Sequence, residues 1–270
     1  MISYCIVSLR PRYSSLLIAD LIRKTTVPFE ILLWLNIDDP AYESFLQEHI
    51  AQGEPIRIIG KTIENIGMQA YYPLFDQARY ELIVQIDDDV IAVSRTIAEQ
   101  ARDIFLRFPR VKQLVADVWQ DDYTTGARPP LSIYRLYRQD YGLYEGPIDG
   151  WFSIFHRSAL PWLPRLPRTA YFPLGGMLKN SLKNRGLLGL LCARFKVFHV
   201  IGPQYAAYFG MLEAEIEKYR RLGRTEIVEW YERARNTLPD RDTMTCRVND
   251  ILAALEHPIG EPINCNRSSG

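Results

Sequence analysis

Short apolar runs and segments of helical periodicity alternate through the first half of the chain. The apolar runs lie at residues 3–8, 30–36, 56–59 and 82–86. Between and after them apolar residues recur every three or four positions, and these predicted helices begin near Ser14, Tyr42, Gln69 and Ser94, with the two serines as caps. Strands joined by helices form a mostly parallel sheet covered on both faces, and such sheets bind ligands at the carboxyl ends of their strands. We therefore predict an α/β fold of this kind.

The second half of the chain is less regular. Further strands are expected at residues 112–118, 132–137, 151–155 and 196–200. Residues 211–238 have helical periodicity that is interrupted near Gly223. We predict one domain over residues 1–210, with halves at 1–117 and 118–210, followed by C-terminal helices and a tail over 211–270.

Composition excludes several classes of protein. The 270 residues carry 32 Lys and Arg against 32 Asp and Glu, whereas a general nucleic-acid binder normally has a basic surplus. The four cysteines form no C-x-x-C pair, which favours a reducing compartment over a disulfide framework. The first residues lack the basic region and cleavage site of a signal peptide, and no apolar stretch is long enough to span a bilayer. We expect a soluble cytoplasmic protein, and its oligomeric state stays open.

Three consecutive acids, Asp87, Asp88 and Asp89, directly follow the apolar run that ends at Ile86. Adjacent carboxylates repel one another, so a buried strand that leads into them needs a cation or solvent there. On an extended chain the side chains of residues i and i+2 point the same way, so Asp87 and Asp89 can converge on one ion. Hard oxygen ligands in an incomplete set suit Mg²⁺ or Mn²⁺, with substrate phosphates as further ligands. The alternative is a solvated acidic turn.

Other short motifs accompany the triplet in a fixed order. They are an opening strand that ends near Ser8, the sequence Pro-Phe-Glu-Ile at 28–31, an Asn-x-Gly loop at 65–67, a Gly-containing strand with a basic end at 150–157, and His-x-x-Gly at 199–202. With the triplet as a DxD motif, this order resembles glycosyltransferases of the GT-A fold, most of all the family-2 group. The resemblance covers roughly residues 2–202.

The resemblance implies a metal-dependent transferase whose donor is a nucleotide-diphosphate sugar, UDP- or GDP-linked. The implied metal ligands are Asp87, Asp89 and His199, although a lone histidine in an apolar strand is more often a core residue. The implied donor contacts are Ser8, Arg10, Asn36, Asp38, Asn65, Gly67, Asp87, Asp88, Gly150 and Trp151. The cation would neutralise the charge that develops on the leaving diphosphate. The family commonly has an Asp where this chain reads Leu35-Asn36.

The acids that inverting members of the family carry near the acceptor are absent from this chain. Their Glu-Asp pair, whose Asp is the general base, would fall at residues 174–179, where the chain reads Leu-Gly-Gly-Met-Leu-Lys. Inversion needs a base that takes the proton of the attacking hydroxyl, and Asp149 is the nearest candidate. A retaining transfer needs no such carboxylate because the leaving phosphate can accept the proton. The stereochemistry is therefore left open.

Residues 150–212 contain no acid. The basic residues of this stretch are Arg157, Arg165, Arg168, Lys179, Lys183, Arg185, Arg194 and Lys196. They form either a solvated basic face or an anion-facing lid over the diphosphate or a phosphate-bearing acceptor, with Trp162, Tyr171 and Phe172 for stacking on sugar rings. Next to the apolar run at 187–191, such charge also suits peripheral contact with the inner face of a membrane.

Two other functions stay open. A non-catalytic relative that binds a nucleotide-sugar or a glycan would explain the missing Glu-Asp pair, and donor hydrolysis with Mn²⁺ would separate it from an enzyme. A sugar-nucleotidyltransferase has a similar sheet but opens with a Gly-rich loop, where this chain has Leu9-Arg10-Pro11-Arg12. For a transferase, the acceptor stays open among a glycan, a lipid-linked molecule and a small molecule.

Overall fold

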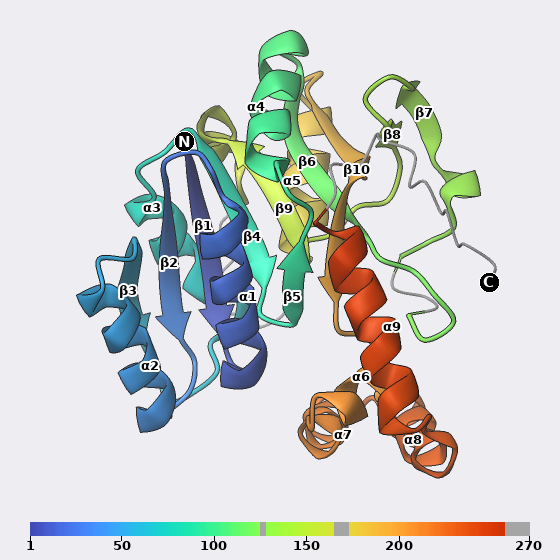
Figure 1. Ribbon diagram of the computed structural model, residues 1–270. Coiled ribbons are helices and arrows are strands. Elements are labelled where there is room, and N and C mark those ends of the chain that lie inside the picture. The colour runs from blue at the N-terminus through green and yellow to red at the C-terminus, as the bar shows by residue number, and fades with distance from the viewer. Residues whose placement is uncertain (125–127, 165–172, 257–270) are drawn as a thin grey trace, which may run out of the picture.

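A ten-stranded sheet runs through the protein (Figure 1). The computed structural model describes residues 1–124, 128–164 and 173–256. The strand order is β3-β2-β1-β4-β9-β6-β10-β8-β7, and β5 pairs with β10 outside this path. The strands are β1 (Ile2–Ser8), β2 (Phe29–Leu35), β3 (Ile56–Lys61), β4 (Leu82–Asp87), β5 (Val90–Val93), β6 (Val111–Val118), β7 (Arg135–Arg138), β8 (Leu143–Glu145), β9 (Phe152–His156) and β10 (Leu188–His199).

Most strands at the core of the sheet point the same way. β1 is parallel to β2 and β4, β3 is parallel to β2, and β6 is parallel to β10. β9 lies antiparallel between β4 and β6, and β5 and β8 are antiparallel to β10. The predicted α/β fold with a parallel core is confirmed. The carboxyl ends of its parallel strands meet at one edge of the sheet, where ligands bind in such folds.

Helices cover both faces of the sheet (Figure 1). Ile2, Tyr4 and Ile6 of β1 share a core cluster with α1, α2 and α4, whereas Cys5 of the same strand shares one with α3 and α5. This division follows because successive side chains of a strand point to opposite faces. The helices are α1 (Pro11–Lys24), α2 (Pro40–Ala51), α3 (Tyr71–Gln77), α4 (Ile97–Arg107), α5 (Leu174–Lys183), α6 (Pro203–Tyr208), α7 (Leu212–Arg221), α8 (Thr225–Ala234) and α9 (Arg241–Ala254).

The two predicted helix caps are wrong. Helix α1 begins at Pro11, whose fixed φ suits a first helical turn, so Ser14 lies inside the helix. Helix α4 follows Thr96, which adopts a left-handed conformation at φ 63°. The Ser94 hydroxyl instead hydrogen bonds with the backbone of Lys196, at 2.9 Å to its carbonyl oxygen and 2.8 Å to its nitrogen. Ser94 therefore joins the end of β5 to β10.

The apolar run at residues 187–191 enters the longest strand. β10 joins this run to the strand predicted at 196–200. Leu190 and Leu191 are fully buried in the core beside β6, so these two leucines do not form the membrane-facing surface that the sequence suggested. Among the described residues, no helix is long and apolar enough to cross a bilayer.

The C-terminal helices pack against the sheet. Tyr13 of α1 and Phe198 of β10 share a core cluster with Met244, Val248 and Ile251 of α9. The predicted interruption of the helical pattern near Gly223 is confirmed, because this glycine lies between α7 and α8 with φ at 65°. Figure 1 shows α6, α7 and α8 beyond the carboxyl ends of the strands. The C-terminal segment thus lies next to the edge of the sheet where a ligand is expected.

Candidate functional site

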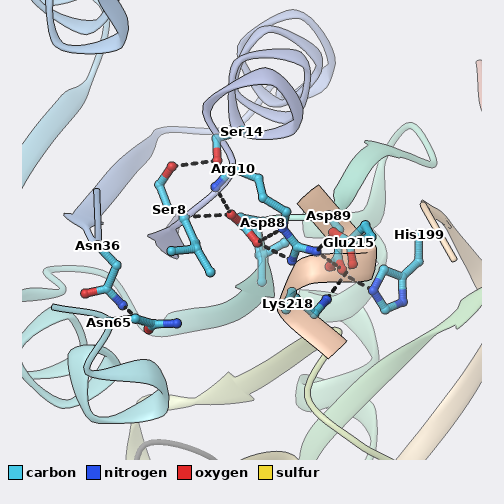
Figure 2. A network of polar contacts seen from close by, with 12 residues as sticks. Ser8, Arg10, Ser14, Asn36, Asn65, Asp88, Asp89, His199, Glu215 and Lys218 are labelled. Atoms are coloured by element: carbon cyan, nitrogen blue, oxygen red, sulfur yellow. Dashed lines mark hydrogen bonds and ion pairs between the residues drawn. The ribbon is translucent and has the colours of Figure 1, made fainter. Parts of the chain in front are cut away.

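The acidic triplet lies where β4 ends, at the carboxyl edge of the sheet. Asp87 is the last residue of β4, and its backbone N–H donates to the carbonyl of Trp151 at 3.0 Å. After the turn, β5 pairs with β10, whose register shifts just before His199. The backbone N–H of Val200 donates to the carbonyl of Asp89 at 2.7 Å. These backbone contacts bring His199 to the triplet across 110 residues of chain (Figure 2).

Asp87, Asp89 and His199 form a group that can hold a metal ion. One ligand atom of each lies within 4.8 Å of the other two. Nε2 of His199 is 2.8 Å from Oδ1 of Asp89, and Nδ1 of His199 is buried without a hydrogen-bond partner. Carboxylate oxygens and an imidazole nitrogen are ligands that divalent cations such as Mn²⁺ accept in proteins. The residues present therefore fit the ion that the sequence predicts.

Asp88 points toward the start of α1 instead. Its Oδ2 accepts the backbone N–H groups of Leu9 at 2.7 Å and Arg10 at 2.6 Å, and its Oδ1 accepts Nε of Arg10 at 3.0 Å. Asp88 is only 4% exposed. Helix α1 has no side-chain cap at its own N-cap residue, Arg10, and Asp88 supplies the acceptor for the backbone N–H of that residue.

Arg10 connects the acids to the C-terminal helices (Figure 2). Its Nη1 lies 2.8 Å from Oδ2 of Asp89 and 2.8 Å from Oε1 of Glu215 on α7. With Asp88 on its other nitrogens, the guanidinium contacts three carboxylates. Arg10 was predicted to contact the nucleotide-sugar donor. The structure places it beside the triplet, where its guanidinium is paired with these carboxylates.

Burial and neighbouring charges shift the pKa values of Asp87, Asp89 and His199 in different directions. Burial, together with the charge of Asp89, raises the pKa of Asp87 to about 7. Burial acts in the same sense on Asp89, but Arg10 and His199 outweigh it and hold the pKa of Asp89 well below its usual range. Burial lowers the pKa of His199, yet Asp89 outweighs that effect and raises it. A bound divalent cation would supply the positive charge that Asp87 needs.

A cavity of about 280 Å³ opens beside the triplet. Asn65 lines this cavity. Its Oδ1 accepts a hydrogen bond from Nδ2 of Asn36 at 2.9 Å and one from the backbone N–H of Gly67 at 2.8 Å. Gly67 is left-handed at φ 57°, a conformation that favours glycine. The structure therefore brings together six of the predicted donor contacts, which are Arg10, Asn36, Asn65, Gly67, Asp87 and Asp88.

Four predicted donor contacts lie outside this cavity, and two of them, Ser8 and Asp38, are engaged elsewhere in the fold. Ser8 is fully buried, and its hydroxyl is 2.7 Å from that of Ser14 and 3.3 Å from that of Tyr42. The side chain of Asp38 is 57% exposed and pairs with Lys61 at 2.7 Å. Neither Ser8 nor Asp38 lines the cavity beside the triplet.

A second cavity, of about 430 Å³, shares Asp87 and Met68 with the first. The predicted residues Asp149, Gly150 and Trp151 line it, and so does His199. Oδ1 of Asp149 accepts the backbone N–H of Gly150 at 2.8 Å, and burial raises the pKa of the Asp149 carboxyl group. The candidate base and the metal group therefore face the same space.

Gly150 and Trp151 shape the floor of this second cavity. A Cβ atom at Gly150 would collide with the side chain of Gln85, whose Nε2 is buried without a hydrogen-bond partner. The indole nitrogen of Trp151 donates to the carbonyl of Ala116 at 2.7 Å. Because the Trp151 carbonyl accepts the N–H of Asp87, this anchored residue also fixes the end of β4.

Close packing explains Gly175, the first glycine of α5. A Cβ atom at Gly175 would lie 2.7–2.8 Å from the carbonyl group of Asp149 and from the nitrogen of Gly150. Side chains do not approach a backbone so closely, so an acid does not fit at position 175 unless Asp149 moves. The carboxylate beside the start of this helix is that of Asp149 itself.

Glu215 and Lys218 of α7 are site residues that the sequence did not indicate. Oε2 of Glu215 is 2.7 Å from Nζ of Lys218, and Lys218 lines the first cavity. In the sequence, an acid and a lysine three residues apart look like an ordinary pair on an exposed helix face. Only the packing of α7 against the start of α1 distinguishes them.

Three of the described basic residues of the acid-free stretch have partners within the fold. Arg157 donates to the backbone carbonyl of Tyr80, and Lys196 pairs with the buried Asp117. The guanidinium of Arg185 lies 4.2 Å from the centre of the Trp162 ring. These residues do not converge on one anion site. Of the other lid candidates, Arg165, Arg168, Tyr171 and Phe172 fall outside the described residues.

Known proteins resemble this chain in structure but not in sequence. No protein-family model matches the sequence, and no curated protein matches it. GalNAc-T7 with UDP, GalNAc and Mn²⁺ superimposes at a TM-score of 0.57, with 13% identity over 75% of this chain and 43% of that one. A fragment of TarS from S. aureus with UDP-GlcNAc gives 0.56, with 11% identity over 80% of this chain and 64% of that one.

The mannosyltransferase PcManGT from Pyrobaculum calidifontis, in complex with GDP-Man and Mn²⁺, also gives a TM-score of 0.56. Its identity is 12%, over 96% of this chain and 81% of that one. This chain thus spans less than half of GalNAc-T7 and most of PcManGT. These likenesses show that the fold is that of GT-A glycosyltransferases, as the sequence motifs predict.

Proposed function

We propose that this protein is a metal-dependent glycosyltransferase that uses a nucleotide-diphosphate sugar. The observation that carries this proposal is the group formed by Asp87, Asp89 and His199, which lies at the carboxyl edge of a GT-A sheet and faces a cavity. Similar structures contain UDP, UDP-GlcNAc or GDP-Man, and two of them contain Mn²⁺. These ligands support a UDP- or GDP-sugar as donor. The acceptor that we propose is a glycan, a lipid-linked molecule or a small molecule.

The two cavities suggest how the donor would lie. The first, with Asn36, Asn65 and Gly67 on its wall, would take the nucleotide. The second, with Asp149 and the unpaired amide nitrogen of Gln85, would take the transferred sugar. Asp87, Asp89 and His199 would hold the ion near both, and the bound ion would neutralise charge on the diphosphate leaving group.

Asp149 is the residue that we propose as general base of an inverting transfer. It lines the second cavity together with Asp87 and His199 of the metal group, and close packing at Gly175 leaves no room for an acid there. In Asp149→Asn the shape is kept but the base is lost, so transfer should fall by about a hundredfold or more while donor binding is retained. If transfer persists and the product keeps the anomeric configuration of the donor, the enzyme is retaining and Asp149 is no base.

Thermal unfolding with UDP, GDP and their sugars, with and without Mn²⁺, tests the proposed function. A ligand at a hundred times its Kd stabilises a protein by about 2.7 kcal/mol, so the correct nucleotide should raise the Tm by several degrees. The rise should need Mn²⁺ and should be absent in Asp87→Asn. If no nucleotide raises the Tm in the presence of Mn²⁺, the proposed function is wrong.

A non-catalytic nucleotide-sugar-binding protein is the second candidate, because the glycines at 175 and 176 replace the expected acids. Such a protein would show the same Mn²⁺-dependent rise in Tm but would not hydrolyse or transfer the sugar. Release of UDP or GDP from the bound donor, followed over hours with Mn²⁺, separates the two. Continued absence of release with every donor that binds would favour the binding protein.

A further inference from the structure

Helix α7 forms one wall of the cavity beside the triplet, although it follows the predicted transferase domain. Lys218 and Leu222, in its last turn and just after it, line this cavity. Both also line an adjoining cavity of about 490 Å³, where Met211 and Leu222 face Leu9 and Ile37 from the sheet side. The space beside the acids is therefore enclosed partly by the C-terminal segment.

A buried acid holds α7 in this place. Glu215 is 5% exposed, and its two carboxylate oxygens contact different cations. Oε1 is 2.8 Å from Nη1 of Arg10, and Oε2 is 2.7 Å from Nζ of Lys218 (Figure 2). A buried charge is retained in a fold when such partners neutralise it. The pair of contacts fixes the position of Lys218 relative to the triplet.

Arg10 and Lys218 differ in how much of their charge is already used. Arg10 contacts the carboxylates of Asp88, Asp89 and Glu215, whereas Glu215 is the ion-pair partner of Lys218 among the described residues. The side chain of Lys218 is 27% exposed and borders the cavity. Its ammonium group can therefore contact a ligand in the cavity without leaving Glu215, because it has three donors.

We propose that α7 completes the donor site and that Lys218 binds the diphosphate of the nucleotide-sugar. This inference rests on the proposed function. Four carboxylates surround the site, and two cationic side chains, Arg10 and Lys218, offset part of their charge. An anionic diphosphate therefore needs further positive charge, or a cation that faces it directly. The metal ion is the first source, and Lys218 is the second. Charge-assisted hydrogen bonds to phosphate are among the strongest that a side chain makes.

Titration calorimetry with UDP, GDP, uridine and guanosine at saturating Mn²⁺ tests this inference. Lys218→Met keeps the aliphatic stem and removes the charge, so we expect it to weaken the binding of the diphosphate by roughly 10- to 100-fold. The affinity for the nucleoside, which lacks phosphate, should stay within twofold of wild type. Lys218→Arg should restore most of the affinity for the diphosphate.

Arg220→Met is the matched control on the same helix. Arg220 pairs with Glu217 and Glu232, its side chain is 56% exposed, and it lines neither cavity. Binding of the diphosphate should be unchanged in this variant. Equal affinity of Lys218→Met and wild type for the diphosphate would overturn the inference alone, and so would an equal loss for nucleoside and diphosphate. If the wild-type protein binds neither UDP nor GDP, the proposed function fails with it.

Discussion

Asp88 differs from the acids on either side of it in what its carboxylate contacts. Asp88 accepts two backbone N–H groups at the start of α1 and the guanidinium of Arg10. Asp87 is half-buried beside Asp89, and burial together with the charge of Asp89 raises its pKa, so its charge is disfavoured where it lies. Removing one partner of a buried ion pair strongly destabilises a fold, whereas a buried carboxylate that is repelled by its neighbour opposes folding. Adjacent residues of one motif should therefore affect stability in opposite directions.

We predict that Asp88→Asn lowers the free energy of unfolding by about 3 kcal/mol, because it leaves the buried Arg10 with one partner fewer. Asp87→Asn should leave the stability of the metal-free protein unchanged or raise it, and should weaken Mn²⁺ binding by at least about tenfold. Urea unfolding in EDTA and Mn²⁺ titration measure the two quantities. A loss of stability in Asp87→Asn as large as in Asp88→Asn would contradict this division.

Among the elements, α5 meets the site through its first turn. Gly175 lies against the backbone of Asp149 and Gly150, whereas a Cβ atom at Gly176 would have its nearest neighbour, the carbonyl oxygen of Ile148, at 3.3 Å. Both glycines lie in the helix, where alanine is intrinsically favoured by about 1 kcal/mol. Alanine substitutions at the two positions therefore distinguish the effect of helix propensity from the effect of contact with the candidate base.

Gly175→Ala should lower the free energy of unfolding by about 1–3 kcal/mol, because the added methyl group overpacks against the Asp149 backbone. It should also reduce transfer, since it displaces the candidate base. Gly176→Ala should be neutral to stabilising and should keep full activity. Chemical denaturation and a transfer assay on both variants check this prediction, and similar behaviour of the two would show that Asp149 is not held by this contact.

Ion pairs join the end of α9 to α1. Glu256, just after α9, lies 2.6 Å from Nη2 of Arg23 and 3.3 Å from Nζ of Lys24. The hydrogen bond from Arg23 and the charge of Lys24 lower the pKa of Glu256 from 4.5 to about 2. A carboxyl group with a lowered pKa in the folded state stabilises the protein above its unfolded pKa, and that contribution is lost as the pH falls through the folded pKa.

Glu256→Gln should therefore destabilise the protein at pH 7 by about 1 kcal/mol, a magnitude reduced by the partial exposure of the pair. The difference from wild type should shrink between pH 4.5 and about 2 and should vanish at lower pH. Glu217→Gln is the control, because Glu217 pairs with Arg220 and Arg221 on an exposed helix face. A difference that persists unchanged at pH 2 would mean that packing, not charge, holds Glu256.

At the scale of the whole molecule, the C-terminal helices and the sheet share a core. Ile251 of α9 is 1% exposed in a cluster with Tyr13 of α1 and Phe198 of β10. Arg10 and Glu215 join the same two parts of the chain at the site. A shared core and a shared ion pair imply that sheet and C-terminal helices unfold together.

Ile251→Ala should lower the unfolding free energy of the whole chain by about 2–5 kcal/mol, as truncation of a buried side chain does. Hydrogen exchange should show the loss equally in β1, β4 and α9. Leu252→Ala, on the less buried side of the same helix, should have a smaller effect. If exchange in β1 and β4 is unaffected by Ile251→Ala, the C-terminal helices form a separate folding unit.

Local chemistry in the sequence determined the class of fold and the centre of the site. Alternating apolar runs and helical periods suffice for a parallel core with helices on both faces, because each pattern reports which face of its own element is buried. The triplet could be identified as a candidate metal site for a similar reason, since three acids at the end of a buried strand need a cation or solvent there. The helix starts at Ser14 and Ser94 were mispredicted because Pro11 begins α1 earlier and because the Ser94 hydroxyl bonds to Lys196 instead of capping α4.

Only the tertiary structure decided how the acids divide their functions and which distant residues complete the site. Three contacts at the site join residues that are far apart in the sequence. Asp88 and Arg10 are 78 positions apart, His199 and Asp89 are 110 apart, and Glu215 and Arg10 are 205 apart. Such pairs depend on strand order, on a register shift in β10 and on the docking of α7, none of which leaves a local pattern. The sequence therefore determined the chemistry at the edge of the sheet, and the packing of remote segments determined what each charged group there contacts.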